Sequence, residues 1–460
     1  MMLPFDLDSF PFKTGVFVVG GTVRDLLAGK TPHDFDLAIE GDYADFAARL
    51  AENTGGRVVE LGRQNHAMLR VATKTCLFDI TPVCGESIDH DLYLRDFTMN
   101  AMALELASGR LIDPLAGQKD LSAKTVRMVS REVFRRDPVR LLRAYRMAAF
   151  FDFDIDKKTR AAIAADVGLI RDSAAERIRD ELYKIMQCDE SYSYVVMMAA
   201  NDLLLSVFPE LAGLKQQRLL PSDPRTLFDR TLEAYKHLEN LLSPAGQFRR
   251  SIGKEAFSDW DTDRPMLLKW AVLLHNLERS PVKSPADRSK KDPARDRGAG
   301  ITQRICRRLR FSRRHSNTIE AIVRHHGRPA AMFDAHRKNL PIKKEFIGLF
   351  LDCGGVTPAV LLHALADFQS RNGPDDPTAV DFAGFTRMLV QRYYSQLKPR
   401  ASTPSAVNGD DLIEEFGLKP SAEFRSILQR LEVERLSHRQ YSREDAFKLV
   451  ADLLDRKKTN

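Results

Sequence analysis

The sequence predicts an α+β fold class, in which a head with a small mixed sheet and helices precedes an all-helical neck, body and C-terminal arm. Between residues 16 and about 115, short β-rich runs alternate with helical stretches. From about residue 120 the strand signals disappear, and apolar residues recur at helical spacing. The chain has 460 residues, of which 43% are hydrophobic and 29% charged, so we expect two to four globular domains.

Six runs in the head predict strands, because they are rich in β-branched and aromatic residues and end at turn residues. In chain order these runs are VFVV (16–19), DFDLAI (34–39), RVVEL (57–61), AMLRVAT (67–73), CLFDITP (76–82) and AMALEL (101–106).

The remainder predicts helices, interrupted at two places. Helical spacing is clearest in PVRLLRAYRMAAFF (138–151), AERIRDELYKIM (175–186) and TLFDRTLEAYKHLENLL (226–242). Residues 280–300, rich in Pro, Lys, Arg and Asp, predict a solvated loop, and residues 398–409 predict a boundary. We therefore expect a head (1–122), a neck (123–220), a body (221–397) and an arm (398–460).

Composition excludes several classes of protein. The five cysteines, Cys76, Cys84, Cys188, Cys306 and Cys353, form no C-x-x-C pair, which argues against zinc ribbons and a disulfide framework. The start of the chain lacks the basic and apolar segments of a signal peptide, and no apolar run approaches the roughly 18 residues that span a bilayer. We expect a cytoplasmic protein without a membrane partner. The net charge of +7 favours a polyanionic partner.

The stretch GGTVRDLLAGKTPHDFD (20–36) combines a glycine pair with two aspartates. Its GKT triplet does not make a P-loop, because Arg24 stands where the first glycine is needed and the triplet closes a helix instead of opening one. Gly20 and Gly21 lie between a strand and a helix start, where unpaired amides and the helix dipole favour a phosphate. Arg24, one turn into the helix, adds a fork of donors.

Asp34 and Asp36 share one face of an extended run, since residues two apart on a strand point the same way. Two carboxylates this close repel, and Mg²⁺ with substrate phosphates would offset the repulsion. Asp79 in LFDIT is a candidate third acid, although a surface carboxylate at a strand end explains it equally well.

Further motifs follow the glycine turn and the D-x-D pair in order. They are DLYLRDFTMNAMAL (91–104), DPLAGQKDL (113–121), RRDPVRLLRAYRMAAFFDF (135–153), ERIRDELYKIM (176–186) and VNGDDLIEEFGLKPSAEF (407–424). Together they resemble the motifs of class II tRNA nucleotidyltransferases and bacterial poly(A) polymerases, within the polymerase-β-like superfamily.

This resemblance implies that an RNA 3′-hydroxyl attacks the α-phosphate of a nucleoside triphosphate and releases pyrophosphate. It implies that Asp34 and Asp36 hold two Mg²⁺ ions. Gly20, Gly21 and Arg24 would cradle the triphosphate, and Arg95 and Asp96 would hold the ribose.

In the neck, the resemblance implies that protein side chains choose the base. Asp137 and Arg140 lie three apart, which predicts one helix face with an acceptor beside a donor fork. That pattern matches cytosine and adenine and refuses guanine and uracil. Arg143 and Arg146 would reach the phosphates.

Two positions depart from the family pattern. Arg136 stands where the family has a glutamate, and Leu94 replaces the first arginine of its doubled pair. The change at Arg136 leaves open whether C, A or both are added.

Residues 228–367 resemble an HD phosphohydrolase domain whose metal ligands have been lost. His275 and Asp367 remain, Asn276 replaces the paired aspartate, and Arg230 replaces an earlier histidine. One histidine and one distant aspartate cannot hold a dinuclear centre. We interpret His325 and His326 as helix-end histidines, and the region as inactive in hydrolysis.

We therefore expect an enzyme that adds C, A or both to tRNA 3′ ends from CTP and ATP. The alternatives are a poly(A) polymerase, a single-step C-adding or A-adding enzyme, an RNA-binding protein without catalysis, and a phosphate-ester hydrolase that uses the HD-like region. The oligomeric state is left open.

Overall fold

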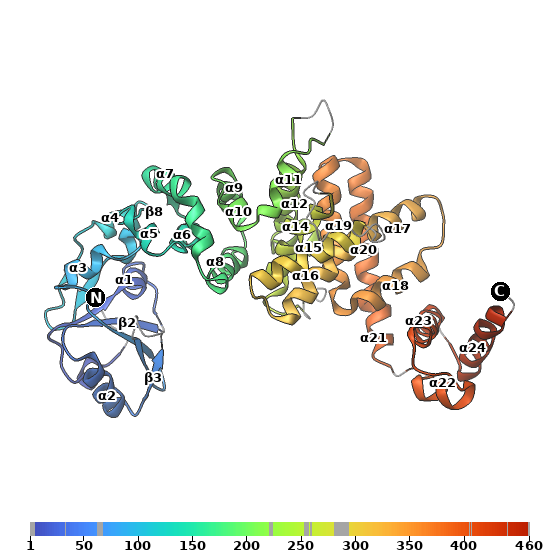
Figure 1. Ribbon diagram of the computed structural model, residues 1–460, viewed down its shortest axis with the longest axis horizontal. Coiled ribbons are helices and arrows are strands. Elements are labelled where there is room, and N and C mark those ends of the chain that lie inside the picture. Colours follow the sequence, from blue (N-terminus) through green and yellow to red (C-terminus); the bar gives the residue numbers. More distant parts are fainter. Residues whose placement is uncertain are drawn as a thin grey trace. The chain divides into compact units, whose positions relative to one another are not determined.

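The computed structural model describes residues 5–32, 34–61, 68–219, 224–252, 257, 260–279, 294–403, 405, 407–438 and 440–458. The chain divides into two compact units, Met1–Val207 and Phe208–Asn460. The first unit contains the sheet, and the second is built from helices (Figure 1).

A seven-stranded mixed sheet forms the head, with the strand order β3-β4-β5-β2-β1-β6-β7. The strands are β1 (Val16–Val19), β2 (Asp34–Ile39), β3 (Arg57–Leu61), β4 (Met68–Ala72), β5 (Leu77–Pro82), β6 (Ala103–Glu105) and β7 (Leu111–Ile112). Neighbours pair antiparallel except β2 and β5, which are parallel. The predicted mixed sheet is confirmed: each of the six predicted runs contains a strand, and only β7 was not predicted.

Alternation along the strands sorts side chains onto two faces of this sheet. On β2, Phe35, Leu37 and Ile39 enter a core that also contains Phe46 and Leu50 of α2 (Tyr43–Thr54). On the other face, Ala38 packs with Phe17 and Val19 of β1 and with Ile88 and Leu92 of α3 (Ile88–Tyr93). Because Asp34 and Asp36 precede Ala38 in steps of two, both carboxylates belong to the α3 face.

Helices complete the first unit. They are α1 (Gly20–Leu27), α4 (Gly117–Ser122), α5 (Glu132–Arg136), α6 (Arg140–Phe151), α7 (Lys157–Asp166), α8 (Ala175–Gln187), α9 (Tyr192–Ala200) and α10 (Leu203–Val207), with 3₁₀ turns at Leu7–Ser9, Thr98–Asn100 and Val167–Asp172.

The neck is not purely helical, contrary to the prediction. Strands β8 (Thr125–Val126) and β9 (Asp154–Ile155) pair in parallel there. Two residues are too few to produce a period-2 pattern, so the sequence carries no signal for this pair.

The second unit is helical in its described residues. Its helices are α11 (Ala212–Lys215), α12 (Leu227–Leu242), α13 (Gln247–Ile252), α14 (Arg264–Leu274), α15 (Ala294–Arg308), α16 (Arg313–His325), α17 (Arg328–Arg337), α18 (Lys343–Cys353), α19 (Thr357–Asn372), α20 (Pro377–Arg392), α21 (Lys398–Ala401), α22 (Gly409–Phe416), α23 (Ala422–Ser437) and α24 (Arg443–Lys458). Shorter turns lie at Pro209–Leu211, His275–Arg279, Gly354–Val356 and Tyr393–Leu397, the last a π-helix.

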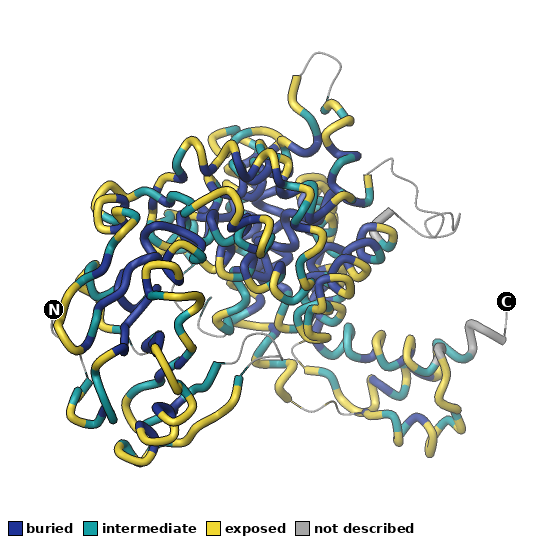
Figure 2. The backbone as a smooth tube through the Cα atoms, turned by 60° about the vertical axis from the view of Figure 1, so that its left-hand side comes forward, coloured by how far each residue is buried: buried dark blue, intermediate teal, exposed yellow. Residues whose placement is uncertain are grey.

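Helices α12, α14 and α19 form the centre of this unit, and most of their residues are buried. Figure 2 colours the backbone by the burial of each residue. The arm helices α22, α23 and α24 form a separate group with its own small core, which includes Leu412, Leu431 and Val450 (Figure 1). Of the predicted loop at 280–300, residues 280–293 lie outside the described residues, and the prediction is wrong for 294–300, which are the start of α15.

One apolar stretch is longer than the sequence analysis expected. Residues Lys343–Asn372 form a 30-residue helical segment that contains an 18-residue window with a mean hydropathy of 1.6, long and apolar enough to cross a membrane by length and composition alone. In the structure 72% of that window is buried, as in the core helix of a folded domain.

Candidate active site

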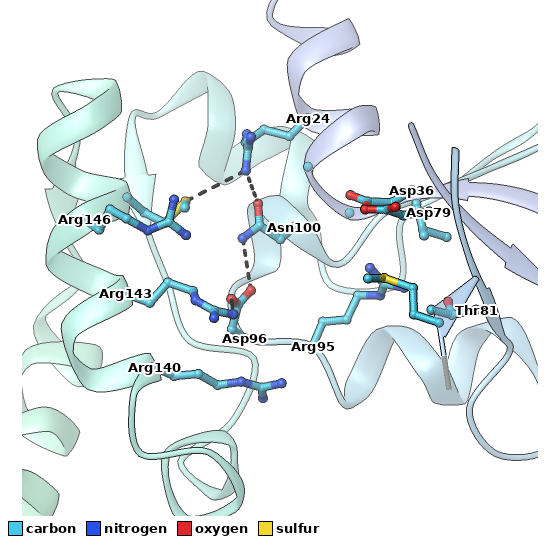
Figure 3. A pocket seen from close by; sticks show the side chains of 15 residues that line it. Arg24, Asp36, Asp79, Thr81, Arg95, Asp96, Asn100, Arg140, Arg143 and Arg146 are labelled. Carbon is cyan, nitrogen blue, oxygen red and sulfur yellow. Dashed lines mark hydrogen bonds and ion pairs between the residues drawn. The ribbon is translucent and has the colours of Figure 1, made fainter. Parts of the chain in front are cut away.

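A cavity of about 480 Å³ in the first unit gathers most of the residues that the sequence singled out. It lies between the glycine turn, the acidic face of the sheet and helix α6 (Figure 3). Its lining includes Gly20, Gly21, Arg24, Asp36, Asp79, Arg95, Asp96, Arg140, Arg143 and Arg146. Asp34 and Asp137 are the two predicted site residues absent from this lining.

The glycine turn joins β1 directly to α1. Gly20 has φ +66°, a left-handed conformation, and a Cβ at this position would lie 2.8 Å from Arg95 Nη1 and 3.5 Å from Asp36 Oδ2. The Gly20 amide donates to the Met102 carbonyl at 3.3 Å. No side chain caps the start of α1. Because Gly21 lines the cavity and the first amides of a helix have no partner within the helix, the start of α1 is a candidate anion site.

Thr22 links the glycine turn to the acidic strand. Its Oγ1 accepts from the Asp36 amide at 2.9 Å and lies 3.4 Å from the Asp34 carbonyl. Thr22 therefore positions β2 beside α1, a role that sequence reasoning missed.

Asp36 and Asp79 stand opposite each other on the parallel strands β2 and β5. Figure 3 shows their carboxylates side by side at the cavity wall. Burial raises the pKa of Asp36 to about 6, with Arg95 and Arg24 lowering it and the Asp79 and Asp34 charges raising it. Arg70 binds Asp79 through two bonds of 2.6 and 2.8 Å, and so offsets one of the two charges.

The metal requirement can be tested on these acids. Among the residues that the structure describes, no three His, Cys, Asp or Glu side chains form a group that holds a metal. Mg²⁺ needs only one or two carboxylates when substrate phosphates and waters complete its shell. Asp36 beside Asp79, with the exposed Asp34 on the same strand face, fits that need, because a cation would stabilise the ionised form of Asp36, which burial and the neighbouring Asp79 and Asp34 charges disfavour by raising its pKa.

Arg24 is buried and held by a chain of hydrogen bonds. Its Nη1 donates to Asn100 Oδ1 at 2.6 Å, and Asn100 Nδ2 donates to Asp96 Oδ1 at 3.0 Å (Figure 3). The guanidinium also pairs with Asp25 and lies over the Phe151 ring, with Cζ 4.6 Å from its centroid. Asn100 thus connects the phosphate side of the cavity to Asp96.

Asp96 is buried and remains an acceptor. Burial acts to raise its pKa, but the Arg143 charge and the Asn100 amide outweigh burial and hold the pKa below its usual value. Its neighbour Arg95 is held by Asp91, whose Oδ2 accepts from Arg95 Nε at 2.9 Å. A charged acceptor and an oriented guanidinium therefore share one side of the cavity.

Arg140, Arg143 and Arg146 recur every three residues on α6 and line the cavity. Glu181 of α8, only 7% exposed, accepts from Arg143 at 3.1 Å and from Arg146 at 2.6 Å. Arg143 also donates to Asp96 at 3.2 Å. The two arginines are thus fixed in place by carboxylates and still border the cavity.

Asp137 differs from its predicted position. It caps the end of α5 with φ −146° and ψ 90°, outside α6, because a residue before proline avoids the helical region. Its carboxylate is paired with Arg177 at 2.9 and 2.7 Å, and lies 3.7 Å from Arg140 Nε. The prediction that Asp137 and Arg140 share a helix face is wrong, although the two side chains remain neighbours.

Sequence reasoning missed Thr22, Asp91, Asn100, Arg177 and Glu181. Each touches a predicted site residue and reaches it through the tertiary fold or across a turn. Asp91, Asn100, Arg177 and Glu181 lie inside motifs already recognised, but other polar residues surround them there, so no local signal singled them out.

In the second unit, the HD-like residues come together without forming a metal group. His275 Nε2 lies 3.2 Å from Asp367 Oδ1, so this pair is adjacent despite its separation in sequence. Arg230 Nη2 donates to Asn276 Oδ1 at 3.3 Å, and burial lowers the pKa of Arg230 to about 10. A guanidinium and an amide therefore lie beside the pair.

The imidazoles of three histidines pack in the same place, two of them, His275 and His363, fully buried and His326 half-buried. The ring centroids of His275, His326 and His363 are 4.8 to 5.2 Å apart. Burial lowers the pKa of His326 and of His363, so both rings are neutral near pH 7. His325 and His326 lie at the C-terminal end of α16, as predicted, and His326 also belongs to this cluster.

Comparison with known proteins gives two family matches. Residues 16–127 match the family described as Poly A polymerase head domain, and residues 152–214 match the family described as Probable RNA and SrmB-binding site of polymerase A. The second match begins in the first unit and ends at residue 214, a few residues into the second unit.

Similar proteins extend the likeness to nearly the whole chain. An A-adding tRNA nucleotidyltransferase of Deinococcus radiodurans is 31% identical over 92% of this chain and 91% of its own length. A CC-adding tRNA nucleotidyltransferase of Synechocystis sp. is 25% identical over 98% of this chain and 96% of its own. The solved structure of the Thermotoga maritima CCA-adding enzyme complexed with tRNA has a TM-score of 0.63, at 24% identity over 95% of this chain and 91% of that one.

Proposed function

Because the chain belongs to the tRNA nucleotidyltransferase family, we propose that it adds C, A or both to the 3′ ends of tRNA, using CTP and ATP and releasing pyrophosphate. The observation that carries this proposal is the placement of Asp36 and Asp79 side by side in a cavity that also contains the glycine turn and Arg24. Paired carboxylates next to an anion site suit the transfer of a nucleotidyl group.

Each residue has a separate task in the proposed reaction. The amides after Gly20 and the Arg24 guanidinium bind the triphosphate, and Arg95 with Asp96 orients the ribose. Asp34, Asp36 and Asp79 would hold Mg²⁺, which offsets the charge that develops at the α-phosphate and lowers the pKa of the attacking hydroxyl. Asp36 must be ionised for this role, which its pKa of about 6 permits at neutral pH.

Base choice is assigned to the start of α6. Arg140 points a donor fork into the cavity, and its Nη1 is held by the Leu94 carbonyl at 3.1 Å. Asp137 would supply the acceptor for the amino group of cytosine or adenine. To bind the base, the Asp137 carboxylate must give up its ion pair with Arg177. Arg136, which stands where the family has a glutamate, adds a further cation next to Asp137 in the chain. Arg143 and Arg146 would contact phosphates from the positions in which Glu181 holds them.

We assign four parts to this activity: a nucleotidyltransferase head (1–122), a base-reading and RNA-binding neck (123–220), a degenerate HD-like body (221–397) and an arm (398–460). The body acts in structure and RNA contact, since a guanidinium and an amide replace two ligands of the HD pattern. We propose the cytoplasm as the site of this reaction, because tRNA and nucleoside triphosphates are present there.

A single-step activity is the second candidate. The full-length relatives described above include one named for A addition and one named for CC addition. A poly(A) polymerase shares the head motifs and is the third product class to be distinguished.

One experiment separates these activities. Purified protein receives tRNA that ends before CCA, after C or after CC, with CTP and ATP separately and together, and the products are resolved by length. Full CCA addition identifies an enzyme that adds both C and A. Addition to only one of the three tRNA ends identifies a single-step enzyme, and long A tails identify a poly(A) polymerase. Asp34→Ala should abolish extension in every case, and unchanged extension would refute the proposed role of the acidic strand.

A further inference from the structure

A second groove adjoins the candidate active site along helix α6. It has a volume of about 770 Å³, within the range of ligand-sized clefts, and is formed by α6, α8 and the residues that follow them. Arg146 lines both this groove and the active-site cavity. Along α6, Arg140 and Arg143 face the cavity, and Ala149 and Phe150 face the groove. The helix therefore leads from one to the other.

The groove exposes an aromatic ring that the described fold does not cover. Phe150 is 61% exposed, although large apolar side chains in this unit are mostly buried. Lys30, the lysine of the GKT triplet, places Nζ 5.2 Å from the Phe150 centroid and 4.8 Å from the Phe151 centroid. Arg24 in turn lies over Phe151. An alternating series of cations and rings thus extends from the phosphate side of the active site to Phe150.

The charges of the groove are divided along its length. Arg146 and Lys184 lie within the helices, whereas Asp152, Asp189 and Glu190 follow the C-terminal ends of α6 and α8. Cations therefore lie near the active site, and acids lie at the other end. This arrangement favours a short anionic segment that starts at the active site and does not continue past the acids.

We propose that this groove holds the unpaired nucleotides immediately upstream of the RNA 3′-hydroxyl, with one base stacked on Phe150 and a phosphate beside Lys30. The inference deepens the proposed function and rests on it, because an RNA primer must leave the active site along some surface. Stacking on an aromatic face is tolerant of base identity and is a common way to hold single-stranded nucleic acid. A cation beside the ring suits the adjoining phosphate.

The test uses the full-length protein and an RNA hairpin with an unpaired 3′ end. Phe150→Leu keeps apolar volume but removes the aromatic face, and Phe150→Tyr keeps the face. We expect Phe150→Leu to raise the KM for RNA about tenfold with the KM for the nucleotide unchanged, and Phe150→Tyr to stay within about twofold of the wild type. Because Phe150 is largely exposed, both variants should fold normally.

Abasic RNA gives the decisive comparison. With an abasic site placed in turn at each unpaired position, one position should raise the wild-type KM about tenfold, and Phe150→Leu should then add no further loss. Additive losses, or no effect of Phe150→Leu, would overturn the inference.

Lys30→Gln should reduce the slope of log K for RNA binding against log salt concentration by about one, the loss of one phosphate contact. Fluorescence anisotropy at several salt concentrations measures this slope. Lys158→Gln, on the exposed surface of α7, is the matched control and should not change it. A Lys30 variant that matches this control would also count against the inference. Failure of the wild type to extend any tRNA would instead refute the proposed function.

Discussion

Replacing Asp36 should stabilise the protein while it abolishes activity, because this carboxylate is held in an unfavourable place. Burial raises its pKa from 3.8 to about 6, a shift of about two units. At about 1.4 kcal/mol per unit, the ionised side chain costs the folded state up to about 3 kcal/mol. Asp36→Asn keeps the shape and removes the charge. In metal-free buffer at pH 7.5 it should therefore raise the free energy of unfolding by about 1 to 3 kcal/mol, a third to all of that cost.

The sign of this effect depends on pH. A carboxyl whose pKa is raised on folding stabilises the folded state below its unfolded pKa of about 4 and loses that advantage as pH rises to about 6. The gain from Asp36→Asn should therefore be present above pH 6 and absent near pH 4. Urea unfolding followed by circular dichroism at pH 4, 6 and 7.5 measures it.

Asp34→Asn provides the matched control for Asp36→Asn. Asp34 is an exposed carboxyl on the same strand face, so this change should leave the midpoint of unfolding nearly the same. Added Mg²⁺ should stabilise the wild type more than Asp36→Asn. Equal stability of the wild type and Asp36→Asn across the whole pH range would refute the electrostatic account of this site.

Three further substitutions test other parts of the structure. Gly20→Ala should cost about 1 to 2 kcal/mol of stability and raise the KM for the nucleotide, because φ is +66° there and the new Cβ meets Arg95; normal kinetics would contradict the tight turn. Glu181→Gln should cost about 2 kcal/mol in urea unfolding, because two arginine contacts lose their charge partner, and an unchanged midpoint would show that Glu181 does not hold them. His363→Leu should reduce the loss of unfolding free energy as pH falls below about 6.5. A histidine whose pKa is lowered on folding takes up a proton when the protein unfolds in acid, and the leucine variant lacks this proton uptake. If the free energy of unfolding falls with pH equally in both proteins, the histidine cluster does not contribute to acid unfolding.

The strands and the acidic pair could be predicted from the sequence because their signals are local. DFDLAI has the alternating pattern of a half-buried strand. Asp34 and Asp36 are two residues apart in it, so they lie on the same face of the strand. The position of Gly20 between a strand run and a helix start likewise needs no distant contact. These features were confirmed in the head.

Other parts of the site depend on contacts between distant segments. Asp79 reaches Asp36 only through the parallel pairing of β2 with β5, 43 residues apart in the chain, and Arg70 joins them from β4. Asp137 lies outside the predicted helix because proline follows it. This signal is local, but the prediction followed the family motif instead. Strands of two residues, such as β8, carry no period at all.

By itself the sequence determined the fold class, the order of the parts, the acidic strand beside the glycine turn and the family to which they point. Only the tertiary structure decided which groups are partners: Asn100 with Arg24 and Asp96, Glu181 with two arginines of α6, and three histidines in one cluster. The physical reason is the range of the interactions. Periodicity and turn preference act over a few residues, whereas burial, ion pairing and the resulting pKa values depend on which distant segments the fold brings within a few ångströms.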